Sequence, residues 1–287
     1  MSPDLASALV RGLSFVALFQ ATGAALFRFR CQAVDLQSDR LLRQIQQRSA
    51  LFGVAMLCIH QALQAALLTG AYSGLLDVDL QALALGSMSA LSMALQGIAL
   101  MGLAFGARQS GLRGGGASGA GLVLALSAFV LMGHTRTHAW RVVLAPLLVL
   151  HLLAVAYWFG ALLPLWMVLK RESLPIVSEV LALFSRTASW LVLLLAAAGG
   201  LLFLLLTHGS PEFSRPYDAL ILAKVAAFLL LMGLAGLNRL RLVPLVAAGQ
   251  QSAVGQLRWS VLGEAVILMG VLGATAFLTS FYSPGAA

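Results

Sequence analysis

Eight apolar runs, each long enough or nearly long enough to cross a bilayer, constrain the fold of this chain more than any other feature. A bilayer core of roughly 30 Å needs about 20 apolar residues in a helix. In lipid, backbone groups must be bonded within the protein, and the runs lack the two-residue alternation of barrel strands. We therefore predict an all-α polytopic membrane protein, a bundle of eight transmembrane helices. The expected spans are Leu5–Phe27, Ala50–Ala71, Ala82–Gly106, Ala120–His134, Val143–Leu169, Arg186–Thr207, Ala219–Leu237 and Ser260–Tyr282.

The composition excludes a soluble globular domain. Hydrophobic residues make up 60% of the 287 residues and charged residues only 10%, whereas soluble domains carry about 25% charged residues. The formal net charge of +8 does not indicate a nucleic-acid partner, because the basic residues are spread between apolar runs and form no patch. The partner is the lipid bilayer, and we expect one integral membrane domain over residues 1–287.

The basic residues also predict the orientation. Thirteen of them follow the first, third, fifth and seventh spans, and only three follow the fourth and sixth. Cytoplasmic loops carry an excess of Lys and Arg, so both termini are expected outside. The thirteen are Arg28, Arg30, Arg40, Arg43, Arg48, Arg108, Arg113, Lys170, Arg171, Arg186, Arg239, Arg241 and Arg258, and the three are Arg136, Arg141 and Arg215.

The fourth expected span is short. Its 15 residues, Ala120–His134, would rise only about 22 Å as a helix. The glycine-rich stretch before it, residues 111–121, is expected to be a flexible cytoplasmic segment. The segment from His134 to His138 would then line a wet outer vestibule, because polar backbone at that depth must be shielded from lipid.

Histidines and methionines are the candidate metal ligands. Three histidines fall at the outer side, His151 lies about 12 Å inside the fifth span and His60 lies near the middle of the second. Met56 precedes His60 by four residues, so the two share a helical face, and Met132 precedes His134 by two. Imidazole and thioether together suit copper, so a copper ion is the expected ligand. The three outer histidines are His134, His138 and His208.

A haem site is the alternative use of the intramembrane histidines. Two histidines on facing helices can bind haem iron axially. His60 and His151 are the candidate pair, because both are expected in the middle of the membrane. A b-type haem redox protein therefore stays open beside a copper protein.

Three charged residues fall inside the spans, where charge is expensive and often functional. Arg11 and Lys224 lie toward the outer side and Glu264 about four residues from the inner end of its span. Glu264 is therefore expected to meet Arg239 or Arg258 and not Lys224.

Trp158 is the aromatic residue expected to accompany the candidate ligand His151. It follows His151 by seven residues, nearly two helical turns, so both side chains share a face. We expect the indole of Trp158 to pack beneath the imidazole of His151. Lys224 or Glu264 could also serve as an acid or base in a membrane enzyme, although no nucleophile–base arrangement accompanies them.

The second half of the chain resembles the copper resistance protein D family. The helix from His151 to Leu165, with its Trp158 and Pro164, looks like the signature helix of that family. Where the family usually has two glycines after the tryptophan region, this chain has Gly160 and Ala161, and Ala161 is small enough for close helix packing. The other matching segments are Gly133-His134, Phe184-Ser185-Arg186, Tyr217-Asp218 through Lys224, Asn238-Arg239 and Glu264.

The resemblance implies a multi-pass protein of the bacterial inner membrane that functions in copper homeostasis. It implies copper movement from periplasm to cytoplasm and a periplasmic copper-binding partner similar to copper resistance protein C. Residues 120–287 would be the part similar to copper resistance protein D, and residues 1–119 an N-terminal three-helix part. His134, His138 and His208 would collect the ion, and His151 with His60 or Met132 would bind it within the bundle. No phosphate-binding GxxxxGK[ST] motif is present, so a transport protein and not an ATP-driven enzyme is expected.

The orientation can be tested with reporters fused after Ala287. An enzyme active only in the periplasm should be active in this fusion, and one active only in the cytoplasm should be inactive, because the positive-inside rule places the C-terminus outside. Activity of the cytoplasmic reporter would contradict the predicted orientation.

Overall fold

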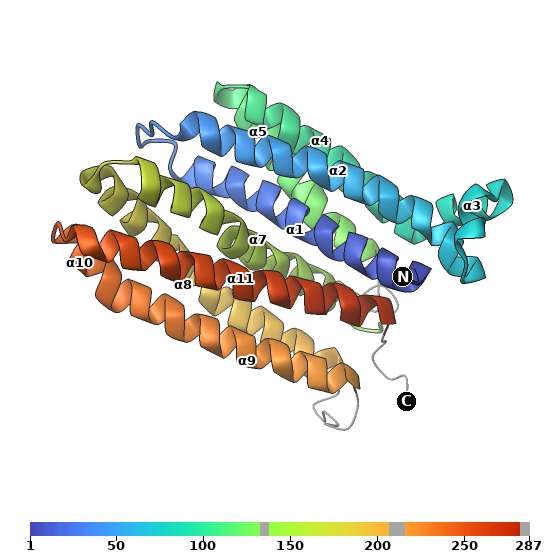
Figure 1. The fold of residues 1–287 in the computed structure, drawn as a ribbon. Coiled ribbons are helices and arrows are strands. Elements are labelled where there is room, and N and C mark those ends of the chain that lie inside the picture. The colour runs from blue at the N-terminus through green and yellow to red at the C-terminus, as the bar shows by residue number, and fades with distance from the viewer. Residues whose placement is uncertain (133–137, 207–215, 282–287) are drawn as a thin grey trace.

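The chain folds into an all-α bundle of long, nearly parallel helices, seen in a computed structural model (Figure 1). The structure describes residues 1–132, 138–206 and 216–281. The N-terminal helices are α1 (Pro3–Arg30), α2 (Asp39–Thr69), the short η1 (Tyr72–Leu76) and α3 (Val78–Leu85), α4 (Met88–Arg108), α5 (Gly111–Ser127) and η2 (Ala128–Leu131). The C-terminal helices are α7 (Arg141–Arg171), α8 (Leu174–Leu206), α9 (Pro216–Leu237), the π-helical turn η3 (Asn238–Leu242), α10 (Val243–Ala247) and α11 (Gln251–Phe281).

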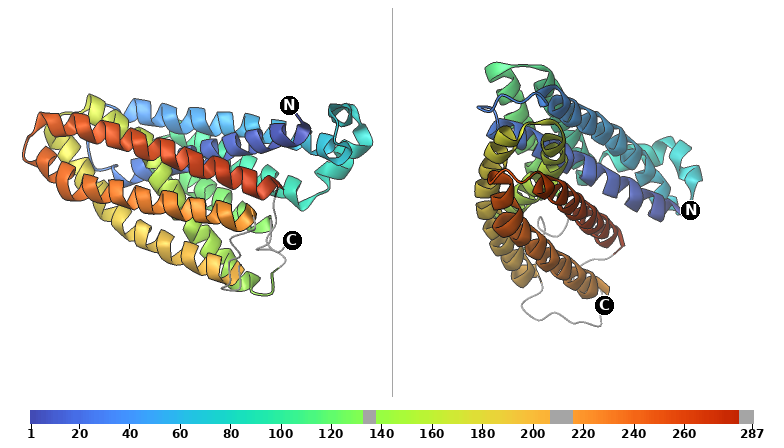
Figure 2. Two further views of the ribbon diagram at one scale, coloured as in Figure 1. Left: turned by 60° about the horizontal axis from the view of Figure 1, so that its bottom comes forward. Right: turned by 60° about the vertical axis from the view of Figure 1, so that its left-hand side comes forward.

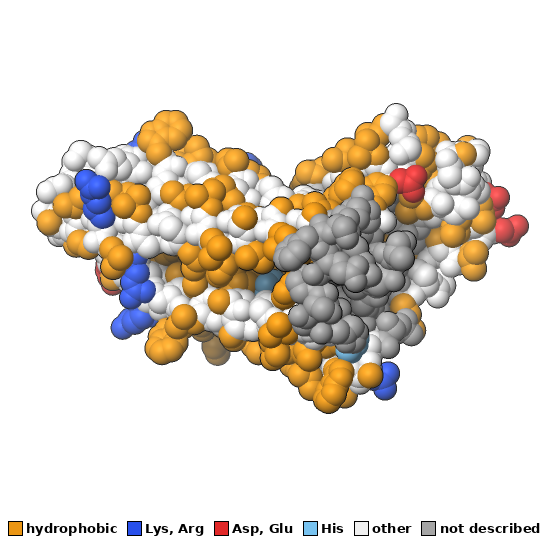
Figure 3. All heavy atoms as spheres, turned by 90° about the horizontal axis from the view of Figure 1, so that it is seen from below, with side chains coloured by type: hydrophobic (Ala, Val, Ile, Leu, Met, Phe, Trp, Pro, Cys, Tyr) orange, Lys and Arg blue, Asp and Glu red, His pale blue; other side chains and the backbone are white. Residues whose placement is uncertain are grey.

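Eight of these helical segments are long and apolar enough to cross a membrane, which confirms the predicted fold class. The N-terminus and the end of α11 lie at the same end of the bundle, as an even number of passes requires (Figure 1). On the face drawn in Figure 3, most Lys and Arg side chains gather at one end and most acidic side chains at the other. This separation is the one from which the positive-inside rule predicts orientation.

Several helices begin earlier than the hydropathy pattern predicts. The helices α2, α8 and α11 begin at Asp39, Leu174 and Gln251, about 10 residues before the expected spans. Polar and basic first turns continue an apolar helix beyond the membrane at no cost, because water can solvate their side chains. Arg186 and all five arginines expected in the first loop are therefore helical. Arg28 and Arg30 lie in the last turn of α1, and Arg40, Arg43 and Arg48 lie in α2.

Two expected spans are wrong in their boundaries. The span Ala82–Gly106 is interrupted at Gly86 and Ser87, where α3 ends and α4 begins with the Ser87 side chain accepting from Ala90 N–H at 3.1 Å. The fourth span is not short, since its helix begins at Gly111 and continues to Leu131. Its 21 residues rise about 32 Å, which removes the reason for an outer vestibule; residues 133–137 lie outside the described residues.

The glycine-rich stretch is helical, and two of its glycines, Gly114 and Gly121, face the neighbouring helix α4. A Cβ added at Gly114 would lie 3.1 Å from the backbone oxygen of Gly106 on α4, and one added at Gly121 would lie 2.7 Å from that of Ala99. Small residues let transmembrane helices approach closely in this way. Glycine here serves helix packing, so its usual association with flexible loops led to a wrong expectation.

The helices form two groups joined by α1. The N-terminal group contains α2, α4 and α5, and the C-terminal group contains α7, α8, α9 and α11 (Figure 2). The first helix packs against α2 on one side and against α7 and α11 on the other. It is therefore a shared wall between the two groups.

The crossing of α1 and α7 depends on two glycines. A Cβ added at Gly23 would lie 2.5 Å from the Cα of Gly160, and one added at Gly160 would lie 2.6 Å from the Cα of Gly23. Nearby, Pro164 has no N–H to donate to the carbonyl of Gly160 four residues earlier. The side chain of Gln20 on α1 donates Nε2–H to that carbonyl at 2.8 Å, so a backbone acceptor freed by proline becomes a bond between helices.

Polar contacts join the helices at the arginine-rich end. Arg28 on α1 donates to Asp39 at 3.5 Å and to Gln46 at 2.7 Å, both on α2. Before α2, both the N–H and the hydroxyl of Ser38 donate to Glu172, which follows α7. These bonds fix how the N-terminal group meets α7 at this end.

Replacing Gly23 with Ala should lower the stability of the bundle. Overpacking a tight contact costs about 1–3 kcal/mol, and here the added methyl group meets backbone that cannot rotate away. The measurement is thermal unfolding of the purified protein in detergent. Gly200→Ala on α8 is the matched control, because a Cβ there meets nothing within 4 Å, and equal melting temperatures for the two variants would contradict this account of the crossing.

Candidate functional site

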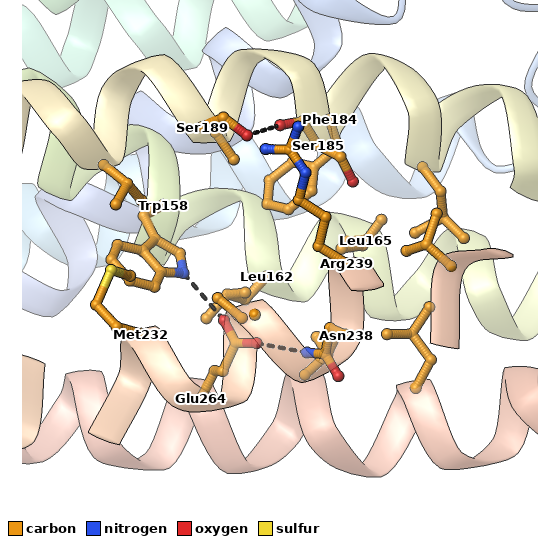
Figure 4. Close-up of a pocket in the computed structure, with 18 of the residues that line it drawn as sticks. Trp158, Leu162, Leu165, Phe184, Ser185, Ser189, Met232, Asn238, Arg239 and Glu264 are labelled. Atoms are coloured by element: carbon orange, nitrogen blue, oxygen red, sulfur yellow. Dashed lines mark hydrogen bonds between the residues drawn. The ribbon is translucent and has the colours of Figure 1, made fainter. Parts of the chain in front are cut away.

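The strongest candidate site is a cavity of about 370 Å³ within the C-terminal group of helices (Figure 4). Its wall is mostly apolar and includes a few side chains with polar or sulfur atoms. Most of the apolar lining comes from α7, α8 and α11. The lining residues with polar or sulfur atoms are Trp158 of α7, Ser185 and Ser189 of α8, Met232 of α9, Asn238 and Arg239 of η3, and Glu264 of α11.

Glu264 is the buried charged group of this cavity. It is only 4% exposed, and it lies 13 residues after the start of α11, about 20 Å along the helix. Trp158 donates Nε1–H to Oε2 at 3.0 Å and Asn238 donates Nδ2–H to Oε1 at 2.7 Å.

The expected pairing of Glu264 with Arg239 or Arg258 is not found. Among the described residues, the ion pairs are those of Arg28 and Arg43 with Asp39. The expectation failed because α11 begins earlier than predicted, which places Glu264 in the middle of its helix. Both partners are neutral, so the hydrogen bonds that hold the carboxyl group of Glu264 bring no cation to it.

Trp158 is held so that its indole N–H meets this carboxylate. Its ring packs edge-on against Phe228 of α9, with 6.4 Å between ring centres. Two residues further along α7, Gly160 is fixed to α1 by the glycine contact and by Gln20. The tryptophan thus connects α7, α9 and α11, a role beyond the predicted packing beneath His151.

Asn238 opens the π-helical turn that separates α9 from α10. Such turns interrupt α-helices frequently at functional sites, and Pro244 shortly afterwards lacks an N–H to continue the regular pattern. Asn238 is 8% exposed, and its Oδ1 is buried without a hydrogen-bond partner among the described residues. The next residue, Arg239, is exposed and lines the cavity.

His151 lies in the same group of helices, nearer the outer end. Its ring packs on α8, where a Cβ at Gly199 would be 3.2 Å from the imidazole. Its Nδ1 is buried and makes no hydrogen bond within the described residues. Lys224 of α9 is its charged neighbour. The imidazole of His151 thus lies against α8, and the indole of Trp158 contacts α9 and α11; the packing of the indole beneath the imidazole stays a prediction.

His60 and Arg11 lie on the other side of α1. His60 is buried on α2, and its charged neighbour is Arg11 of α1. Arg11 donates Nη1–H to the carbonyl of Thr279 at 3.2 Å and lies 5.7 Å from the ring centre of Phe15. Since α2 and α7 each pack on α1, the structure does not bring His60 and His151 onto facing helices.

The remaining candidate ligands are spread over the bundle. Met56 is partly buried one turn before His60, and Met132 ends η2. His138 precedes α7 and accepts the N–H of Trp140 at 3.1 Å. In the parts of the chain that the structure describes, no three His, Cys, Asp or Glu side chains come together as a metal site. His134 and His208 lie outside the described residues.

Cys31, at the end of α1, is an unsuitable copper ligand while its thiol is protonated. Burial raises the pKa of its thiol to about 11, and the thiolate is the form that binds metals. Neither cysteine is in a disulfide bond.

The residues that match a known protein family form several of the helices around this cavity. Residues 178–278 match the family model described as "Copper resistance protein D". This part of the chain is similar to the copper resistance protein D family. The matched region contains α9, η3, α10 and most of α8 and α11, so it contains Asn238, Arg239 and Glu264 but not His151 or Trp158.

A curated relative gives the same family name. Copper resistance protein D of Pseudomonas syringae pv. tomato is 31% identical over 140 residues, which are 43% of this chain and 45% of that protein. The chain thus matches less than half the length of this relative. No solved structure matches the chain.

Three of the segments that carried the predicted resemblance meet in space. Phe184-Ser185, Asn238-Arg239 and Glu264 are far apart in sequence, yet all line the cavity with Trp158. Met232 and Gln20 were not anticipated. Pro164 signals a free carbonyl at Gly160, but nothing in the sequence says that Gln20 reaches it.

Replacing Trp158 with Phe should destabilise the bundle while keeping an aromatic ring in place. The change leaves Oε2 of Glu264 buried without its donor, which costs about 1–3 kcal/mol. Thermal unfolding in detergent measures the loss. Trp190→Phe on α8 is the control, since Trp190 is 73% exposed; unfolding unaffected by Trp158→Phe would show that the hydrogen bond contributes nothing to stability.

Proposed function

We propose that this protein is an inner-membrane copper transport protein that moves copper from the periplasm to the cytoplasm through its C-terminal group of helices. The observation that carries the proposal is the coincidence of the family match, residues 178–278, with helices that wall the cavity. The eight apolar helices support the location in a membrane, and the name of the similar family supports copper as the metal.

The proposed route follows one face of α7. The ion first meets His151, whose buried Nδ1 has no partner among the described residues. It then passes to the level of Trp158 and Glu264, two helical turns deeper, and leaves past Arg239 at the arginine-rich end. A carboxylate along the route lowers the cost of a cation inside the membrane.

Binding along such a route must be weak enough for release. The charge of Lys224 acts on His151, and it opposes a second cation there, the more strongly where little water screens the two. Conduction requires sites that bind well enough to load and loosely enough to unload. A histidine beside a lysine fits a transient site.

The outer histidines are proposed to collect the ion before it reaches His151. They are His138, at the start of α7, together with His134 and His208. A periplasmic protein similar to copper resistance protein C is the proposed donor. We propose no enzymatic step, and the division into residues 1–119 and 120–287 stays a prediction.

In the N-terminal group, Met56 and His60 remain proposed ligands of lower rank, since α1 separates their helix from α7. The same separation removes the support for a haem held between His60 and His151, because axial ligands must come from facing helices. No other observation favours a haem site.

Replacing His151 with Ala should abolish copper accumulation while leaving the fold intact. Losing one ligand from a site with few ligands should weaken binding by about tenfold or more, since changes around the ligands alone cost about 10–100-fold. The measurement is cellular copper in cells that express each variant, normalised to the amount of protein in the membrane.

The control is Leu150→Ala, one residue earlier on α7, where the side chain is exposed. It should accumulate copper like the unmodified protein. Full accumulation by the His151→Ala variant at equal expression would overturn the assignment of His151.

A further inference from the structure

We propose that the cavity beside Glu264 is a binding site for Cu(I), formed by the carboxylate of Glu264, the thioether of Met232 and the side-chain oxygen of Asn238. This inference rests on the proposed function, and it identifies the ion's oxidation state and a second, deeper binding position. The three side chains come from α11, α9 and η3 and line the same space (Figure 4).

The charge of Glu264 gives the first argument. A carboxylate buried in a low-dielectric interior is costly unless a cation compensates it. Glu264 is nearly fully buried, and its two partners, the indole of Trp158 and the amide of Asn238, are neutral. An ion of charge +1 in the adjoining cavity would balance the carboxylate of Glu264, whereas Cu(II) would exceed its charge by one.

The amide of Asn238 gives the second argument. A carboxylate can only accept hydrogen bonds, so the amide presents its N–H to Glu264 and leaves Oδ1 without a donor among the described residues. A carboxamide has a donor and an acceptor on one rotatable group. When a cation takes the place of the N–H beside Glu264, a half-turn of the amide brings Oδ1 to the ion.

Met232 gives the third argument, because it determines which cation suits the site. Its side chain lies next to Trp158 at the cavity wall (Figure 4). Thioether ligands favour Cu(I) over harder cations such as Mg²⁺ or Ca²⁺. One soft ligand with two oxygen ligands also gives modest affinity, as a site of passage requires.

Arg239 is the competing cation. It lines the same cavity and is exposed, yet it forms no ion pair with Glu264 in the described structure, where the ion pairs involve Asp39. Glu264 is therefore available to a mobile ion.

The test measures Cu(I) binding by the purified full-length protein in detergent. Anaerobic competition with a chromogenic Cu(I) chelator gives the dissociation constant. The His151→Ala background removes the nearest other proposed ligand, and the ligands that remain elsewhere are common to all the variants compared. In this background Glu264→Gln and Met232→Leu should each weaken Cu(I) binding by about tenfold or more. Copper X-ray absorption should show a sulfur neighbour that Met232→Leu removes.

The matched controls change the same chemical groups outside the cavity. Glu179→Gln on α8 and Met269→Leu on α11 alter exposed side chains and should leave the affinity unchanged. Since Glu264→Gln could disturb folding, each variant is also compared by thermal unfolding, and Met232→Leu tests the site without removing a buried charge.

Two outcomes would overturn the inference: Cu(I) affinity unchanged in both the Glu264 and Met232 variants, or affinity reduced as much by the two controls. The proposed function fails separately, if cells that express the unmodified protein accumulate no additional copper. Cu(I) binding that depends on Glu264 and Met232 would stand in that case as a site without transport.

Discussion

The close crossing of α1 and α7 is the contact on which the rest of the bundle depends. Gly23 and Gly160 bring the two backbones together, and Gln20 bonds the carbonyl that Pro164 leaves free. Without a hydrophobic driving force between helices in lipid, such packing and hydrogen bonding hold transmembrane helices together. Because α1 also packs on α2 and α11, this crossing joins the N-terminal group to the group that contains the cavity.

The crossing also determines what the cavity can hold. Trp158 lies half a turn before Gly160, so fixing α7 against α1 fixes the direction of the indole N–H. That N–H and the amide of Asn238 hold Glu264 in one orientation. The result is a carboxyl group held by two neutral donors, beside a cavity of about 370 Å³.

Much of the fold was predictable, because hydropathy is a local property. The number of spans, the helical class and the segregation of arginine at one end follow from composition along the chain. The boundaries were less predictable. Polar first turns made α2, α8 and α11 appear to begin late, and glycine made residues 111–121 look flexible. Both errors arise because the residue type does not reveal the surroundings of a side chain. A polar residue or a glycine can lie in a loop, on a helix face in water or against a neighbouring helix.

The candidate site was predictable only in part. The resemblance picked out Trp158, Asn238 and Glu264 one by one, and depth estimates pointed to His151. Depth estimates also suggested arginine partners for Glu264, an error that followed from the late start assigned to α11. Met232 gave no signal, because methionine in an apolar helix is most often a packing residue.

The sequence by itself determined that this chain crosses a membrane eight times, since lipid accepts only long apolar helices and each run reveals its own length. It also determined which residues are expensive to bury, because charge in an apolar run is visible without a structure. Only the tertiary structure decided which of them meet. Helix packing in lipid depends on small residues and single hydrogen bonds between distant segments, such as Gly23 with Gly160, Gln20 with Gly160 and Glu264 with Trp158 and Asn238. No periodicity along the chain encodes such pairs, because each depends on how two helices cross.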